Sequence, residues 1–122
     1  MKKKIVVIDD QEDLLELTRR LLEARGYEVV TSTDSKNALG LIKKELPSLI
    51  IMDMLMPDKD GAEICNEVKS DTAVAHIPVI LATGQMIGDA ELLQEGLKPA
   101  NDYLIKPFEI DDLLTKIKDL II

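Results

Sequence analysis

The apolar run at residues 49–57 constrains the fold more than any other part of the chain. Its hydrophobic residues do not alternate with polar ones, which is typical of a strand buried on both faces, as in a parallel sheet. The run carries one carboxylate, that of Asp53. A turn is predicted at Pro57 and the polar residues that follow it. Ligands of open α/β sheets bind beyond the carboxyl ends of the strands, so a functional site is expected near Asp53.

Composition limits the class of protein. The 122 residues suffice for one domain spanning 1–122. Hydrophobic residues make up 46% of the chain but aromatic residues only 2%, so we expect an aliphatic core. The net charge of −8 disfavours direct binding to nucleic acid, and no basic amphipathic or long apolar stretch predicts membrane contact. A single cysteine, Cys65, rules out an internal disulfide and fits a cytoplasmic protein.

Short apolar runs predict three more strands, at residues 5–8, 77–82 and 102–105, and the more polar run at 28–31 predicts a fourth, nearer an edge of the sheet. Between and after the strands, apolar residues recur at helical spacing, which predicts five helices. Five strands alternating with five helices favour a doubly wound α/β fold, in which a five-stranded parallel sheet is covered on both faces. Periodicity alone leaves the order of the strands open.

The predicted helices follow each strand in turn. The first is expected to end near Gly26 and to bury a leucine face formed by Leu14, Leu15, Leu17, Leu21 and Leu22. Asp34 or Ser35 is expected to cap the second helix. The third is expected at about 60–70 and the fourth at about 89–95, and the last begins near Glu109.

Polar side chains stand at the ends of four of the five predicted strands. They are Asp9 and Asp10, then Asp53, Thr83 and Lys106. Two carboxylates about 4 Å apart repel each other by roughly 4 kcal/mol at an effective dielectric constant near 20, so three carboxylates together favour a bound cation. Oxygen ligands without histidine or cysteine favour Mg²⁺. Carboxylates, Mg²⁺, a lysine and a hydroxyl are the groups that phosphoryl transfer requires, and a carboxylate can itself be the nucleophile.

Nearly the whole chain resembles the response regulator receiver domain of two-component signalling. The resemblance rests on an ordered set of motifs: Asp9-Asp10, Asp53 with Met56-Pro57 and Asp60-Gly61, Thr83-Gly84, Asp102-Tyr103 and Lys106-Pro107-Phe108. It implies a flavodoxin-like sheet of order 2-1-3-4-5. It also implies a phosphoacceptor protein rather than an enzyme, whose chemistry is limited to its own phosphoryl transfer and self-dephosphorylation.

By this resemblance, Asp53 accepts a phosphoryl group from a phosphohistidine on a sensor histidine kinase or phosphotransfer protein. Asp10 and Asp53 are implied to coordinate Mg²⁺ directly, together with the backbone carbonyl of Leu55. Asp9 is implied to act mainly through a water molecule. The cofactor expected is therefore Mg²⁺.

The resemblance also implies a conformational switch. Lys106 would pair with a phosphoryl oxygen, Thr83 would move toward the phosphate, and Tyr103 would turn inward into the space that Thr83 leaves. The backbone at Met54 and Gly84 would contact the phosphoryl group, because Gly84 has no side chain to hinder its amide. The face formed by the fourth helix, the fifth strand and the fifth helix would then bind a downstream protein target of unknown identity.

Three further features follow from comparison with the family pattern. A cis peptide is implied before Pro107. Pro99 stands where the family usually has a glycine, so Gly96 is expected to end a shortened fourth helix and to alter the output face. Leu55 and Gln85 flank the site, and because apolar Leu55 positions an attacking water poorly, we expect slow self-dephosphorylation.

Several alternatives remain at this stage. A phosphatase of the dehalogenase type would need an acid two residues after the nucleophile, where Leu55 stands. A non-phosphorylated scaffold with the same fold is disfavoured by the intact acidic and lysine positions. The chain could also be a receiver cut from a longer regulator. Taken alone, Asp9-Asp10 could be a helix cap, and Tyr103 a half-buried packing residue.

Overall fold

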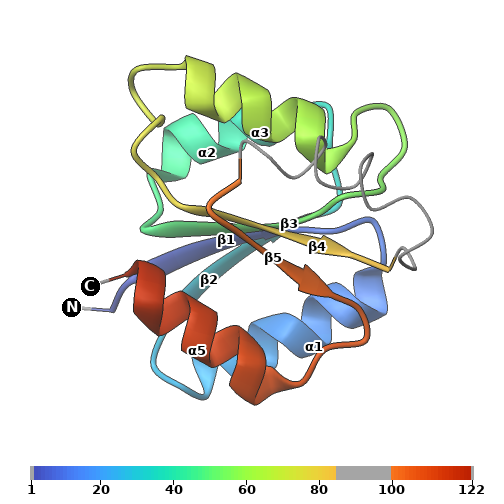
Figure 1. Ribbon diagram of the computed structural model, residues 1–122, viewed down its shortest axis with the longest axis vertical. Helices are drawn as coiled ribbons and strands as arrows, with labels where there is room; N and C mark the ends of the chain where they lie inside the picture. The colour runs from blue at the N-terminus through green and yellow to red at the C-terminus, as the bar shows by residue number, and fades with distance from the viewer. Residues whose placement is uncertain (1, 85–99, 122) are drawn as a thin grey trace.

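A sheet of five parallel strands forms the centre of the computed structural model, which describes residues 2–84 and 100–121 (Figure 1). The strands are β1 (Lys4–Ile8), β2 (Glu28–Ser32), β3 (Leu49–Asp53), β4 (Val79–Thr83) and β5 (Asp102–Ile105). Their order is β2-β1-β3-β4-β5, and every neighbouring pair is parallel. The predicted α/β fold and the implied strand order are both confirmed.

Helices cover both faces of the sheet in the described part of the chain. They are α1 (Glu12–Glu23), α2 (Ala38–Glu45), α3 (Gly61–Ser70) and α5 (Ile110–Leu120). Helices α2 and α3 lie on one face, and α1 and α5 lie on the other (Figure 1). None of these helices has the length and apolarity to span a bilayer. The helix predicted at 89–95, together with Gln85, Gly96 and Pro99, lies outside the described residues.

The core consists of two aliphatic layers, one on each side of the sheet. Strand β3 contributes to both, with Ile50 and Met52 packed on the α2–α3 side and Leu49 and Ile51 on the α1–α5 side. All five residues of β3 are buried, which explains why its sequence shows no alternation. Cys65 is buried in the α2–α3 layer, and this burial raises the pKa of its thiol to about 11.

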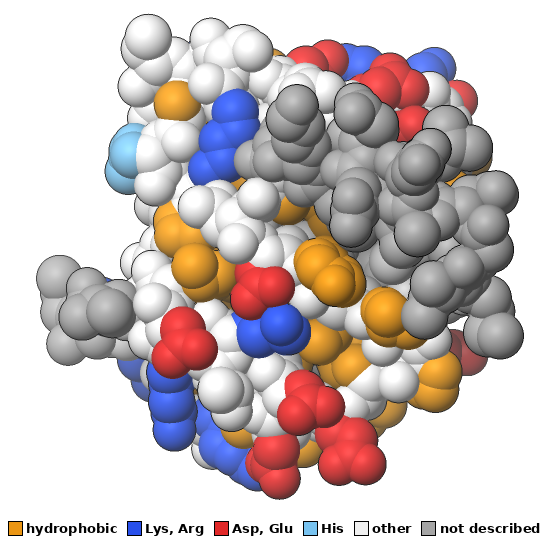
Figure 2. All heavy atoms as spheres, in the orientation of Figure 1, with side chains coloured by type: hydrophobic (Ala, Val, Ile, Leu, Met, Phe, Trp, Pro, Cys, Tyr) orange, Lys and Arg blue, Asp and Glu red, His pale blue; other side chains and the backbone are white. Residues whose placement is uncertain are grey.

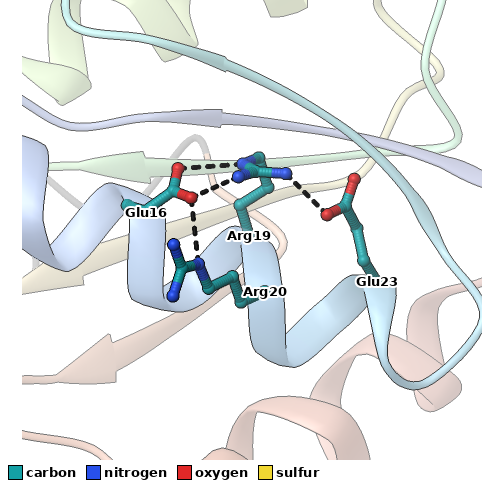
Figure 3. Close-up of polar contacts among 4 residues, drawn as sticks. All are labelled: Glu16, Arg19, Arg20 and Glu23. Carbon is teal, nitrogen blue, oxygen red and sulfur yellow. Dashed lines mark hydrogen bonds and ion pairs between the residues drawn. The ribbon is translucent and has the colours of Figure 1, made fainter.

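The prediction of which α1 residues are buried needs correction. Leu15 and Leu22 are buried as expected, but Leu17 is 53% exposed and Thr18 is buried instead. The buried face therefore follows positions 15, 18 and 22, at helical spacing. On the solvent side, Arg19 bridges Glu16 and Glu23 while Arg20 pairs with Glu16, as Figure 3 shows. Such exposed pairs stabilise a helix by only about 0.3–0.5 kcal/mol each.

Neither residue predicted to cap α2 directly precedes the helix. Asn37 does, and its side chain makes no capping hydrogen bond. The Asp34 carboxylate accepts from the Asn37 side-chain amide at 2.6 Å and from the Asn37 backbone N–H at 3.4 Å, so it closes the turn that leads into the helix. The Ser35 hydroxyl donates instead to the carbonyl of Pro57 at 2.5 Å, a contact across 22 residues of sequence. For Ser35, a long-range partner has therefore replaced the local capping role.

The register of the sheet determines which strand ends meet. Ile8 of β1 is paired with Met52 of β3, so the residues that follow them leave the sheet side by side. Asp53 is paired with Ala82 of β4. At the next pair of strands, the Lys106 backbone N–H donates to the Thr83 carbonyl at 2.7 Å. The polar residues at the ends of β1, β3, β4 and β5 therefore share one edge of the sheet.

Candidate functional site

Three carboxylates converge at this edge. Asp9, Asp10 and Asp53 each offer an oxygen, and these oxygens all lie within 4.8 Å of one another. Asp9 and Asp53 are buried, at 6% and 7% exposure, whereas Asp10 is exposed. Asp9 also accepts a hydrogen bond from the Gln11 N–H at 2.9 Å, ahead of α1. A local role at the start of α1 therefore explains the hydrogen bond to one carboxylate oxygen of Asp9. It does not explain why the Asp53 carboxylate lies beside Asp9.

Lys106 reaches this cluster from the end of β5. Its Nζ lies 3.0 Å from Oδ2 of Asp9 and 3.4 Å from Oδ2 of Asp53. The side chain is only 16% exposed, so solvent screens these contacts weakly. The peptide bond between Lys106 and Pro107 is cis, as the resemblance implied.

The charges and donor atoms of the cluster fit a divalent cation. Three carboxylates and one ammonium leave an excess of two negative charges in a partly buried site. All of the converging carboxylate ligands are hard oxygen donors, and the described residues place no histidine or cysteine among them. This is the ligand set that Mg²⁺ prefers, and an exposed residue such as Asp10 leaves the site open to solvent.

The electrostatic strain of the cluster appears in the pKa of Asp53, which is raised to about 6. Burial of the carboxylate is the main cause, and repulsion by Asp9 adds to it. Lys106 and a hydrogen bond from the backbone N–H of Leu55 act in the opposite direction. Lys106 alone therefore does not neutralise the site.

This shifted pKa predicts how stability depends on pH when Mg²⁺ is absent. Asp53 titrates at about 6 in the folded protein and near 3.8 when unfolded, so the ionised carboxylate is destabilising above pH 6. That cost disappears as the pH falls from 6 toward 4, and Asp53→Asn removes it at every pH. We expect Asp53→Asn to raise the free energy of unfolding at pH 7.5 by on the order of 2 kcal/mol.

Urea denaturation of the parent and the variant in a chelator, at pH 7.5 and pH 4.5, measures this difference. Both proteins share all other titrating groups, so the difference between them reports Asp53 together with its interactions with Asp9 and Lys106. A difference that stays the same at the two pH values would contradict the assignment.

The loop after β3 places two backbone amides near the site. The Met54 N–H donates to the Ala82 carbonyl at 2.7 Å, and contact of the Met54 backbone with a phosphoryl group stays a prediction. The next amide, that of Leu55, is the one that reaches the Asp53 carboxylate. Sequence reasoning missed this donor because it depends on how the loop turns, which no residue type there signals.

Thr83 and Gly84 end β4 at the same edge. Thr83 is fully buried, at 0% exposure, and Gly84 is exposed. A Cβ at Gly84 would meet no heavy atom within 4 Å, so there is open space beside this backbone. Contact of Thr83 and Gly84 with a phosphoryl group at Asp53 stays a prediction.

Tyr103 lies apart from the carboxylates. Its side chain is 48% exposed, and its ring centroid is 5.9 Å from Nζ of Lys116 on α5. Lys116 also pairs with Asp102 at 3.1 Å. The structure therefore brings together Asp9, Asp10, Asp53 and Lys106, whereas inward movement of Tyr103 stays a prediction.

Comparison with known proteins agrees with this geometry. The family model of the response regulator receiver domain matches residues 5–118. "Probable transcriptional regulator ycf27" of Cyanophora paradoxa is 38% identical over 125 aligned positions, which cover 98% of this chain and 48% of that protein. A response regulator receiver domain protein from Clostridium thermocellum has a TM-score of 0.86 and 34% identity, over 98% of this chain and 94% of that one.

A further solved structure is the receiver domain of the sensor histidine kinase PA1611 from Pseudomonas aeruginosa. It has a TM-score of 0.87 and 27% identity, over 99% of this chain and 98% of that one, and it holds a magnesium ion in its active site cleft. The chain belongs to the response regulator receiver domain family. It spans about half the length, or less, of the curated relatives it matches.

Proposed function

We propose that the protein is a phosphoacceptor switch in which Asp53 takes a phosphoryl group in a Mg²⁺-dependent reaction. The observation that carries the proposal is the meeting of three carboxylates within 4.8 Å, with Lys106 Nζ 3.4 Å from Asp53. A receiver domain of this family, that of PA1611, holds magnesium in its cleft. Membership of the family also argues against the phosphatase alternative.

The donor in this proposal is a phosphohistidine on a sensor histidine kinase or phosphotransfer protein. An oxygen of Asp53 forms a bond to phosphorus while the phosphorus–nitrogen bond breaks and its electron pair stays on the imidazole. Bound Mg²⁺, held by Asp10, Asp53 and the Leu55 carbonyl with Asp9 acting through water, would neutralise negative charge on the phosphoryl oxygens. Lys106 supplies further positive charge, and the Leu55 and Gly84 amides and the Thr83 hydroxyl supply donors.

A groove beside the site favours a protein as phosphodonor. It has a volume of about 430 Å³, and Lys106 is one of the residues that line it. Its walls come from α1, from the loop between β5 and α5 and from the first residue of α5, and include Leu14, Leu17, Pro107 and Phe108. Figure 2 shows hydrophobic side chains gathered next to the acidic start of α5. An apolar surface continuous with the phosphoacceptor suits a helical segment of a partner.

Phosphorylation then changes the balance of conformations. It adds roughly −1.5 to −2 charge and three acceptor oxygens. These acceptors favour whichever conformation brings Thr83 and Lys106 close, and the exposed Tyr103 would report that change at the surface of β5 and α5. A cytoplasmic downstream protein that reads this face completes the proposal.

Phosphoryl incorporation tests this function. The parent is incubated with a small phosphodonor such as acetyl phosphate, with Mg²⁺ or with a chelator, and compared with Asp53→Asn. We expect stoichiometric, hydroxylamine-labile labelling that needs Mg²⁺ and is lost in Asp53→Asn. The control Asp71→Asn, which changes a carboxylate paired with Lys43 on α2, keeps full labelling. Labelling that persists in Asp53→Asn, or none in the parent, would favour the scaffold alternative.

Loss of the phosphoryl group is expected to be slow. Leu55 is 54% exposed beside the site and has no polar atom in its side chain to orient an attacking water. We therefore expect a lifetime of minutes or longer, and Leu55→Asn, which adds such polar atoms, shortens it. Decay of the label after the donor is removed measures both rates. A parent lifetime of only seconds would contradict this expectation.

A further inference from the structure

Ser35 carries a buried hydroxyl that joins two distant loops. Its side chain is 4% exposed. The Oγ donates to the carbonyl of Pro57 at 2.5 Å and accepts from the backbone N–H of Lys59 at 3.5 Å. Both of these partners lie in the loop between β3 and α3, 22 and 24 residues away in the sequence.

The loop that Ser35 contacts contains a strained turn. The Lys59 N–H also donates to the Pro57 carbonyl at 2.9 Å, which closes a three-residue turn around Asp58. Asp58 has a φ of +71°, a conformation that costs a residue with a side chain about 1–2 kcal/mol. A γ-turn of this hand is rare, so a contact from outside the loop is needed to hold it.

Several contacts hold the loop between β3 and α3, among them the Met54 N–H to the Ala82 carbonyl at 2.7 Å and Lys59 Nζ to Glu67 at 2.6 Å. Two others lie on either side of Leu55. At its base, the Gly61 N–H donates to the Met54 carbonyl at 2.8 Å. At its tip, Ser35 binds the strained turn. Between these two points lies Leu55, whose N–H contacts Asp53.

We propose that Ser35 is a positioning residue for the phosphoacceptor site. Its hydroxyl holds the Pro57–Lys59 turn, and the turn keeps Leu55 oriented so that its N–H serves Asp53 and its carbonyl can serve Mg²⁺. This inference rests on the proposed function, because it takes Mg²⁺ as the ligand of the site. The remote hydroxyl touches neither the metal nor the phosphoryl group.

Mg²⁺ affinity of the purified protein tests the inference without any measurement of phosphorylation. Ser35→Ala removes the hydroxyl with almost no change in volume, and we expect it to weaken Mg²⁺ binding about fivefold by isothermal titration calorimetry. The matched control is Thr18→Val. Thr18 is a buried hydroxyl that donates to the Leu14 carbonyl at 2.8 Å, within α1. This control loses a hydrogen bond of the same kind and keeps the Mg²⁺ affinity of the parent.

A second variant separates positioning from general destabilisation. Asp58→Gly removes the backbone strain, since glycine adopts positive φ freely, so the turn no longer needs the Ser35 hydroxyl. In a double-mutant cycle, Ser35→Ala should cost less than twofold in Mg²⁺ affinity when Asp58→Gly is already present. In each comparison the two proteins have the same residue at position 58, so the charge lost in Asp58→Gly does not affect the measured cost of Ser35→Ala.

The outcomes distinguish the inference from the proposed function. A parent that binds Mg²⁺, with equal affinity in Ser35→Ala, would overturn the role of Ser35 alone. An equal loss in Thr18→Val, or an undiminished loss in the Asp58→Gly background, would overturn it as well. A parent that does not bind Mg²⁺ would contradict the proposed function and the inference together.

Discussion

Replacing Gly61 by alanine is expected to lower the free energy of unfolding by about 3 kcal/mol. A Cβ at this position would lie 2.4 Å from the backbone oxygen of Asp53 and 3.0 Å from Cα of Met54. Both neighbours belong to the main chain at the end of β3, so neither can move without displacing the strand that carries Asp53. The start of α3 packs this closely because only a hydrogen atom stands between it and the strand.

Gly40 provides the matched control for this substitution. It lies on the exposed face of α2, and a Cβ there would meet no heavy atom within 4 Å. Gly40→Ala should therefore raise the free energy of unfolding by about 0.5–1 kcal/mol, because alanine favours the helix. Urea denaturation measures both variants. A loss smaller than about 1 kcal/mol in Gly61→Ala would contradict the close packing described at the end of β3.

Replacing Asp10 by asparagine is expected to weaken Mg²⁺ binding by about 100-fold or more. Removal of groups that merely orient metal ligands costs about 10–100-fold, and a direct carboxylate ligand should cost at least as much. Asp10 is the suitable position because it is exposed, whereas Asp9 and Asp53 are buried and pair with Lys106. The fold should therefore persist in Asp10→Asn.

Asp13→Asn is the control for the loss of one negative charge near the site. Asp13 is exposed in the first turn of α1 and is not part of the carboxylate cluster. We expect its Mg²⁺ affinity to stay within about twofold of the parent, because exposed charges are screened by solvent and salt. Isothermal titration calorimetry compares the three proteins, and equal affinities for the parent and Asp10→Asn would exclude Asp10 as a ligand.

The sheet and its functional edge could be predicted because they depend on strong, redundant signals. The apolar runs of β1, β3 and β4 can be buried only between two layers, and β3 shows this most clearly. The edge strands β2 and β5 are more polar and partly exposed. Polar residues directly after buried strands must leave the sheet at its carboxyl edge. The meeting of Asp9, Asp53 and Lys106 therefore follows from the parallel arrangement, once neighbouring strands are known.

The errors of prediction arose where a side chain or amide had two possible partners. Ser35 is a good helix cap by residue type, yet its hydroxyl binds Pro57 from a distant loop. The Leu55 amide as a donor to Asp53 was missed, because it depends on how the loop after β3 turns. Leu17 shares the spacing of a buried face but faces solvent. These choices depend on tertiary contacts, which periodicity and residue type do not encode.

Trapping the phosphorylated residue tests the central proposal most directly. Borohydride reduces an aspartyl phosphate to homoserine, and peptide mass spectrometry then identifies the position that has changed. After incubation with acetyl phosphate and Mg²⁺, we expect homoserine at position 53 and aspartate retained at positions 9 and 10. Homoserine at another position, or aspartate retained at 53 in protein that carries the label, would contradict the assignment of Asp53 as the phosphoacceptor.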